Sequence, residues 1–317
     1  MVFYKRLTIV LGLLFIVPIA TPAQTAGTAQ NPPAPLGKLV DVGGYRVHLY
    51  CAGTGSPTVV IVGAGFSFNW GLVQPEVAKD AQVCSYDHSG IGWSDDGPKD
   101  SCALRVSEVH TALKNAGIKG PYVLVGHSLG ALVARLYAGR YPDEVAGMVF
   151  VDHAMAIPDG MLILAPPHSD ARVPPQLPPP MPSTPSGGGP VAFGIESDPN
   201  FGKLSARDRE LHLWAMAQTR SQKALQSNHE MMPGCVAEAD AITRGHSHAL
   251  GDKPVVDVTT VDSARDTELH SKLLSLSQNS KPVIAEKSGH FIIIDRPDVV
   301  IDAISQVVQS VRKNAKL

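Results

Sequence analysis

Short apolar runs alternate along the chain with longer segments whose apolar positions recur every three or four residues. The short runs predict buried strands, and the longer segments predict amphipathic helices. Strands are expected at residues 57–62, 82–86, 122–125, 148–151, 254–260 and 282–285, after a hairpin at 38–42 and 45–51. Helices are expected at residues 70–78, 103–116, 129–137, 267–276 and 298–311. This alternation predicts the α/β class, with a mostly parallel central sheet and helices on both of its faces.

Residues 154–251 interrupt the alternation and predict an inserted cap. Eleven of the 26 prolines lie between residues 158 and 190, and neither a helix nor a sheet can run through so dense a proline segment. A helical pattern returns over residues 206–227, and a loop is expected from Met231 to Gly251. The α/β core is therefore expected to comprise residues 37–153 and 252–317.

The N-terminal segment has the order of a secretory signal peptide. Lys5 and Arg6 precede an apolar run over residues 7–20, and small residues follow. We expect a signal peptide over residues 1–23, a disordered leader over 24–36, and a periplasmic or extracellular protein without a stable membrane partner after cleavage. The alternative is an uncleaved anchor, although the run is short for a transmembrane helix.

Composition limits the remaining classes of partner and cofactor. The 317 residues are 44% hydrophobic, enough for one large core, and the formal net charge of −2 gives no indication of a nucleic-acid partner. No cysteine or histidine spacing is typical of a metal site, and the glycines near residue 63 lack the continuation of a dinucleotide motif. We therefore expect neither a metal nor a cofactor.

Four cysteines can oxidise in an exported protein. Cys102 precedes an expected helix and Cys235 lies in the expected cap, so we hypothesise that these two pair. Cys51 and Cys84 lie in or beside apolar strand-like runs and are interpreted as buried thiols.

The most informative motif is the G-x-S-x-G sequence at Gly126–Gly130. It joins an apolar strand to a helical pattern, which is the context of a nucleophile elbow. The two glycines avoid clashes with the adjoining strand and helix, so the hydroxyl of Ser128 is exposed at a helix N-terminus, where partial positive charge favours an oxyanion. We predict that Ser128 is a nucleophile.

A serine nucleophile needs a base and a group that orients the base. His290 is the expected base because it follows the last strand, at the sheet edge where ligand sites form. Asp262, which follows strand 254–260, is the preferred acid. Asp152, at the end of strand 148–151, and Asp266 are the alternatives.

Two backbone amides are expected to form an oxyanion hole. One belongs to Leu129, directly after the nucleophile, and the other to Phe66, in the loop after strand 57–62. Gly63 and Gly65 allow that loop to turn tightly.

These motifs resemble the α/β-hydrolase superfamily, in the cap-bearing branch of bacterial esterases, proline iminopeptidases and perhydrolases. The matching pieces are Gly126–Gly130, the Asp87-x-x-Gly90-x-Gly92-x-Ser94 turn, Gly65-Phe66, and Ser288-Gly289-His290. Two features depart from the family: Ala64-Gly65 stands in place of the usual His-Gly, and Thr260-Val261-Asp262 stands in place of Gly-x-x-Asp. A serine at the elbow argues against the dehalogenases and epoxide hydrolases of the superfamily, which use aspartate there.

The expected function is that of a serine hydrolase that cleaves a small carboxylic ester through an acyl-enzyme. Substrate contacts are expected from Phe68, Trp93, Trp214 and Phe291. An amidase or aminopeptidase is the alternative, in which a cap carboxylate would hold the substrate amine; Glu196, Glu210, Glu230 and Glu238 are available, and the sequence does not select one. A non-catalytic ligand binder of the same fold is a further alternative.

Overall fold

A computed structural model describes residues 32–153, 194–243 and 248–317. The predicted signal peptide and most of the predicted leader lie outside the described residues, as do residues 154–193 and 244–247 of the predicted cap.

An eight-stranded sheet forms the centre of the described chain, in the order β1-β2-β4-β3-β5-β6-β7-β8. β1 and β2 are antiparallel to their neighbours, and all pairs from β4 to β8 are parallel. The strands are β1 Lys38–Asp41, β2 Arg46–Ala52, β3 Thr58–Val62, β4 Val83–Asp87, β5 Tyr122–His127, β6 Val145–Val151, β7 Val255–Thr260 and β8 Ser280–Ala285. The predicted α/β class and mostly parallel sheet are confirmed.

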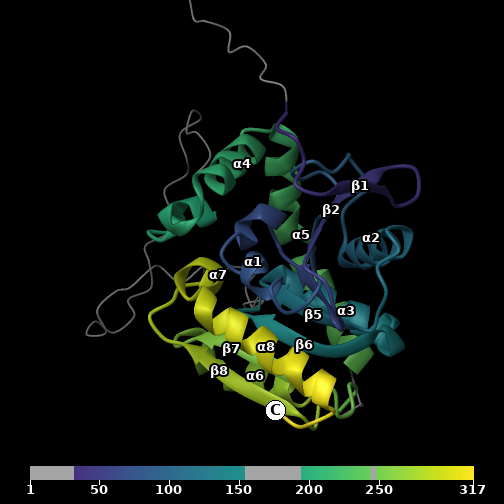
Figure 1. The fold of residues 1–317 in the computed structure, drawn as a ribbon, viewed down its shortest axis with the longest axis vertical. Helices are drawn as coiled ribbons and strands as arrows, with labels where there is room; N and C mark the ends of the chain where they lie inside the picture. Colours follow the sequence, from purple (N-terminus) through teal and green to yellow (C-terminus); the bar gives the residue numbers. More distant parts are fainter. Residues whose placement is uncertain (1–31, 154–193, 244–247) are drawn as a thin grey trace, which may run out of the picture. The chain divides into compact units, whose positions relative to one another are not determined.

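Helices cover both faces of the sheet (Figure 1). The α-helices are α1 Gln74–Val77, α2 Cys102–Asn115, α3 Leu129–Arg140, α4 Ala206–Met216, α5 Thr219–Thr243, α6 Thr267–Leu274, α7 Ile292–Asp295 and α8 Pro297–Lys313. Short 3₁₀ turns are η1 Ser67–Trp70, η2 Pro142–Glu144, η3 Ile195–Ser197, η4 Phe201–Lys203 and η5 Ser263–Arg265.

The side chains of β3 point alternately to the two faces of the sheet and pack against the helices on each face. All five residues of β3 are buried. Val60 and Val62 pack in the cluster that includes α2 and α3, whereas Val59 and Ile61 pack in the cluster that includes α1 and α8. A strand buried on both faces reads as a continuous apolar run, which is why the sequence pattern located it.

The described part of the predicted cap differs from expectation. α5 continues through Pro233 to Thr243, where the sequence predicted a loop from Met231 onward. A proline inside a helix removes one backbone hydrogen bond. Here tertiary contacts outweigh that cost, because Met232, Cys235 and Ala239 are buried in the cluster shared with α3. The single helix expected at residues 70–78 is replaced by η1, which ends at Trp70, and by the short α1.

Both cysteine pairs form disulfides. Cys102 on α2 pairs with Cys235 on α5, as hypothesised from the sequence. The interpretation of Cys51 and Cys84 as buried thiols was wrong, because these residues are bonded to each other. They are directly opposite in the antiparallel register of β2 and β4, which places their side chains together.

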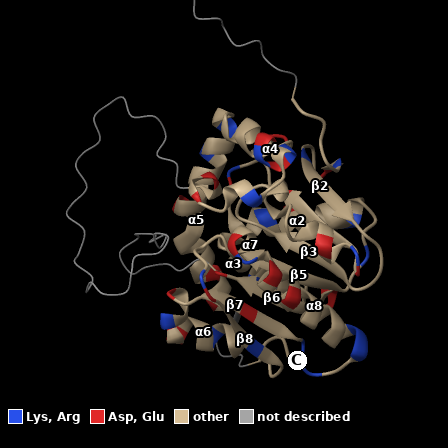
Figure 2. Ribbon diagram, turned by 60° about the vertical axis from the view of Figure 1, so that its left-hand side comes forward, with Lys and Arg blue, Asp and Glu red and all other residues tan. Residues whose placement is uncertain are grey.

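Charged residues are interspersed among the elements, without one sign gathering over a single set of helices in the view of Figure 2. Within the described ranges, no helix has both the length and the apolar character needed to cross a membrane.

Candidate active site

Ser128 lies at the sharp turn between β5 and α3, as the sequence predicted. Its φ of 55° and ψ of −130° are unusual for a residue other than glycine. A Cβ on Gly130 would lie 1.9 Å from the carbonyl oxygen of Val62, and one on Gly126 would lie 2.5 Å from Cα of Ala131. The two glycines of the motif are therefore required by the close approach of backbone.

Two backbone segments meet beside Ser128, as expected for an oxyanion hole. Leu129 is the first residue of α3, so its amide has no acceptor within that helix. Phe66 directly precedes η1. Ser128, Leu129 and Phe66 all line one cavity.

Side chains from distant elements fix the loop that contains Phe66. The buried carboxylate of Asp87 accepts the backbone N–H of Ser67 at 2.6 Å through Oδ1. Its Oδ2 lies 2.9 Å from Nδ1 of His48. From the other side, Asn228 on α5 donates its amide to the carbonyl oxygen of Ala64 at 3.0 Å. The Asp87–Ser94 turn thus contributes structurally to the rim of the site.

His290 and Asp152 form a close pair. His290, between β8 and α7, has Nδ1 2.6 Å from Oδ2 of Asp152, which directly follows β6. The side chains are 16% and 6% exposed. Burial raises the pKa of Asp152, but the hydrogen bond and charge of His290 outweigh burial and hold that pKa below its usual value. Asp152 is therefore a carboxylate that can orient the imidazole and stabilise its protonated form.

The sequence-based preference for Asp262 as the partner of His290 is corrected by this geometry. The side chain of Asp262 is 63% exposed and lies 3.3 Å from Arg265. η5 begins directly after Asp262, so the chain turns at that point. Asp266 caps α6, where its Oδ1 accepts the N–H of Leu269 at 3.0 Å. Asp152, the second choice from the sequence, contacts the histidine.

His127, the residue before Ser128, contacts the loop that contains His290. Its Nε2 donates to the carbonyl oxygen of His290 at 2.9 Å, and the two rings lie 4.9 Å apart between centroids. Burial lowers the pKa of His127 to about 4, with a further contribution from the charge of His290. A neutral imidazole with Nε2 protonated fits the single acceptor that faces it. No pattern in the sequence indicated this contact.

Ser128 and His290 open into a cavity of about 460 Å³. The cavity has an apolar part from the core and from α4 and α5, and a polar part mostly from those helices and η3. The apolar lining includes Trp70, Ile195, Met216, Leu225, Met232, Phe291 and Ile293; the polar lining includes Asn69, Glu196, His212, Gln222, Gln226, Asn228 and His229.

Ser128 Oγ and His290 share no hydrogen bond among the described residues. We expect one to form when a substrate fills the cavity, because catalytic hydrogen bonds often tighten only in the substrate complex. With Nδ1 of His290 on Asp152, Nε2 is the atom that can take the hydroxyl proton.

Only Phe291 of the four expected substrate contacts lines the cavity. Phe68, Trp93 and Trp214 pack on one another instead, with centroid distances of 5.7 Å and 5.3 Å between successive rings. Trp214 lies on α4 and packs against Phe68 and Trp93, which are buried. Composition alone could not separate this core from a pocket wall.

A polar chain in the cavity wall was missed by sequence reasoning. Nδ1 of His212 lies 3.0 Å from Oδ1 of Asn69, and its Nε2 lies 2.9 Å from Oε2 of Glu196. Burial raises the pKa of Glu196, but the hydrogen bond from His212 outweighs it, so this pKa is below its usual value. The three residues belong to separate segments, and no local motif marks them.

Comparison with known proteins identifies the family. The model of the α/β-hydrolase fold family matches residues 57–297, which is most of the chain. The chain belongs to the α/β-hydrolase family. The resemblance carried by the elbow and its surrounding motifs is therefore confirmed.

This α/β hydrolase is similar to several named hydrolases over part of its length. It is 41% identical over 101 residues to a protein named "putative carbamate hydrolase" from Escherichia coli O17:K52:H18, covering 31% of this chain and 36% of that protein. It is 33% identical over 132 residues to 2-hydroxymuconate semialdehyde hydrolase from Pseudomonas sp. (strain CF600), covering 39% and 46%. Both relatives are named as hydrolases.

Solved structures extend the similarity to nearly the whole fold. A meta-cleavage product hydrolase from Pseudomonas fluorescens IP01 matches with a TM-score of 0.58 and 18% identity, covering 85% of this chain and 98% of that chain. At this identity the match shows the fold alone. The chain spans only about a quarter to a half of the curated relatives that it matches first, at 26%, 48% and 37% of their lengths.

Proposed function

We propose that this α/β hydrolase cleaves a small carboxylic ester through Ser128, His290 and Asp152. The observation that carries the proposal is the joint placement of an elbow serine and a carboxylate-bound histidine at one cavity. The relatives named above support hydrolysis of a small molecule, and the ester class is the finer proposal.

The reaction follows from the positions of the groups. Ser128 Oγ attacks the acyl carbon as His290 Nε2 accepts its proton, and Asp152 stabilises the resulting imidazolium. The amides of Leu129 and Phe66 hold the oxyanion, where the loss of one donor typically costs on the order of 10²–10³ in rate. The imidazolium then protonates the leaving alcohol. Water activated by His290 releases the acid and regenerates the serine.

Amide hydrolysis is the second candidate, and Glu196 is the observation that favours it. Its carboxylate lines the cavity and could hold a substrate amine, as an aminopeptidase requires. However, Glu196 is already hydrogen-bonded to His212. A substrate amine would have to compete with that contact, so the ester proposal ranks first.

We also propose that the protein is exported to the periplasm or the cell exterior. The charged and apolar segments over residues 1–23 have the order of a signal peptide. Two disulfides support the proposal, because such bonds persist in oxidising compartments. Fractionation of the producing cells, with N-terminal sequencing of the protein, would test it.

The first experiment compares the wild-type protein with the Ser128→Ala variant on p-nitrophenyl esters from acetate to octanoate, and on aminoacyl p-nitroanilides. Ester turnover that disappears in the variant would support the proposal, and the chain-length profile would measure the acyl pocket. Turnover of the anilides alone would favour the amidase. If neither series is turned over, labelling of Ser128 by an organophosphonate would separate an enzyme with another substrate from a ligand binder.

A further inference from the structure

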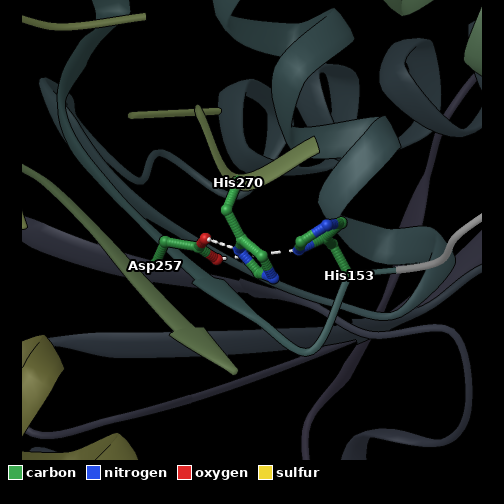
Figure 3. Close-up of side chains that lie close together, drawn as sticks. All are labelled: His153, Asp257 and His270. Carbon is green, nitrogen blue, oxygen red and sulfur yellow. Dashed lines mark hydrogen bonds and ion pairs between the residues drawn. The ribbon is translucent and has the colours of Figure 1, made fainter. Parts of the chain in front are cut away.

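Three side chains that can bind metals meet outside the cavity of Ser128. His153 follows β6, Asp257 lies in β7, and His270 lies on α6 (Figure 3). One ligand atom from each lies within 4.8 Å of those of the other two. None of the three lines the cavity described above. The group is therefore not part of the proposed hydrolytic site.

Several polar atoms of this group are buried without a partner in the described part of the chain. His153 is 7% exposed, and neither of its ring nitrogens has a hydrogen-bond partner there. Oδ1 of Asp257, which is fully buried, is also without one. Nδ1 of His153 and Oδ1 of Asp257 face each other at 3.6 Å. That distance is too long for a hydrogen bond, yet it is close to the separation of about 3.4 Å between two ligands of a tetrahedral zinc ion.

His270 provides an independent indication of a cation. Its Nδ1 lies 2.5 Å from Oδ2 of Asp257, and its Nε2 lies 2.9 Å from the carbonyl oxygen of Ser263. A neutral imidazole has one N–H, so it cannot donate to both oxygens. When Nε2–H donates to Ser263, the lone pair of Nδ1 faces the carboxylate. A metal ion satisfies both groups once Nδ1 and Oδ2 separate from 2.5 Å to the roughly 3.4 Å between two zinc ligands. A ligating histidine commonly donates its other N–H to a backbone carbonyl.

We propose that His153, Asp257 and His270 bind one divalent transition-metal ion, of which Zn²⁺ is the representative. Two imidazoles and one carboxylate are a donor set typical of zinc and of neighbouring transition metals, and they leave a coordination position for water. Ca²⁺ and Mg²⁺ prefer oxygen donors, so the two histidines disfavour them. The ion would join the carboxyl end of β6 to β7 and α6.

A small cavity of about 200 Å³ gives access to the site from the side of α6. His153 lines it together with Asp240, Asp266 and Glu268, and the basic residues Arg135 and Lys272 also contribute. Acidic groups thus outnumber basic ones along this route.

The competing explanation for the two contacts of His270 is a second proton on its ring, held by Asp257, with no metal involved.

Zinc binding to the full chain without an affinity tag would test the site. We expect dialysis against micromolar Zn²⁺, followed by elemental analysis, to give one ion per chain and a raised melting temperature. His153→Phe removes both ring nitrogens at similar volume, and we expect it to weaken binding on the order of 100-fold or more. The matched control is His110→Gln, because His110 also lies against a carboxylate, 3.2 Å from Glu144.

A structural role for His153 predicts a different result. If the ring only fills space, His153→Phe would leave zinc binding and its thermal shift unchanged, which would overturn the proposal. Absence of zinc binding by the wild-type protein would overturn it without any variant. Should His153→Phe fail to fold, as judged by circular dichroism, His270→Gln provides the same comparison.

Discussion

Two aspartate–histidine pairs lie at adjacent strands of the sheet, and only one faces the nucleophile. Asp152 binds His290 at 2.6 Å, and Asp257 binds His270 at 2.5 Å. None of the four side chains is more than 16% exposed. The pairs are nearly identical in distance, yet their surroundings differ completely.

The difference lies in what the second ring nitrogen meets. Nε2 of His270 is bound to the carbonyl oxygen of Ser263, so it cannot accept a proton from a substrate or a nucleophile. His290 instead lines the cavity that also contains Ser128. A carboxylate beside a histidine is therefore insufficient to indicate general-base chemistry. The partner of the far nitrogen decides whether such a pair serves proton transfer or structure.

The largest expected effect is on the base itself. His290→Ala removes the proton acceptor of Ser128, and we expect kcat on the best ester to fall on the order of 10⁴–10⁶-fold, because triad residues act as a unit. His110→Ala, a change at a histidine outside both pairs, should alter kcat less than twofold. A His290→Ala enzyme that retained a tenth of the wild-type rate would contradict the role given to this pair.

The acid can be tested by two parallel substitutions. Asp152→Asn leaves His290 in the wrong tautomer, and we expect a loss in kcat on the order of 10³–10⁴-fold. Asp262→Asn changes an exposed carboxylate paired with Arg265, and we expect a rate within twofold of wild type. Steady-state kinetics on both variants measures the contrast. A large loss of kcat in Asp262→Asn, with a rate near wild type in Asp152→Asn, would show that Asp262 is the acid of the triad.

The second pair should affect stability more than turnover. Asp257→Asn leaves His270 beside an uncharged amide in a buried site, and we expect a loss of about 3 kcal/mol in the free energy of unfolding. Urea denaturation measures this loss. We expect the fold-loss in kcat of the folded Asp257→Asn variant to be at most a tenth of the fold-loss caused by Asp152→Asn. A loss below about 0.5 kcal/mol would show that the pair is not structural.

Mild acid should destabilise the protein through histidines outside both pairs. Burial lowers the pKa of His127 to about 4 and that of His88 to about 3. Below pH 6.5 the unfolded chain protonates these histidines while the folded chain does not, so the free energy of unfolding decreases as the pH is lowered. Relative to pH 7, each histidine should lower the free energy of unfolding by about 2 kcal/mol at pH 5. Both paired aspartates have lowered pKa values and stay ionised there.

Chemical denaturation at pH 7 and pH 5 checks this loss. His88→Phe should depend less steeply on pH than wild type, because it removes one of the two groups. Equal pH dependence in both proteins would exclude His88 as a source of the acid sensitivity.

Local patterns account for what the sequence predicted correctly. The elbow and the buried strands depend on residues that are neighbours in the chain, so apolar runs and the glycines of Gly126–Gly130 located them. The position of His290 at the cavity was also predictable, because this residue follows a strand at the edge where sites form.

The remaining features depend on contacts between distant segments. Asp152 and Asp262 both follow strands, and only the turn of η5 directs one of them to solvent. The helix through Pro233 depends on packing against α3, and the Cys51–Cys84 bond depends on strand register. Likewise, His153, Asp257 and His270 have no short-range spacing that would mark a metal site.

The disulfide between α2 and α5 has a consequence for the maturation of the protein. α5 contributes Leu225, Asn228 and Met232 to the wall of the cavity, and Cys235 fixes the helix one turn beyond them. A newly made chain with reduced cysteines lacks this covalent tether, so its cavity wall is free to separate from the core. We expect hydrolysis to begin in full only after oxidation, which would keep the chain inactive while it remains in the compartment where it is synthesised.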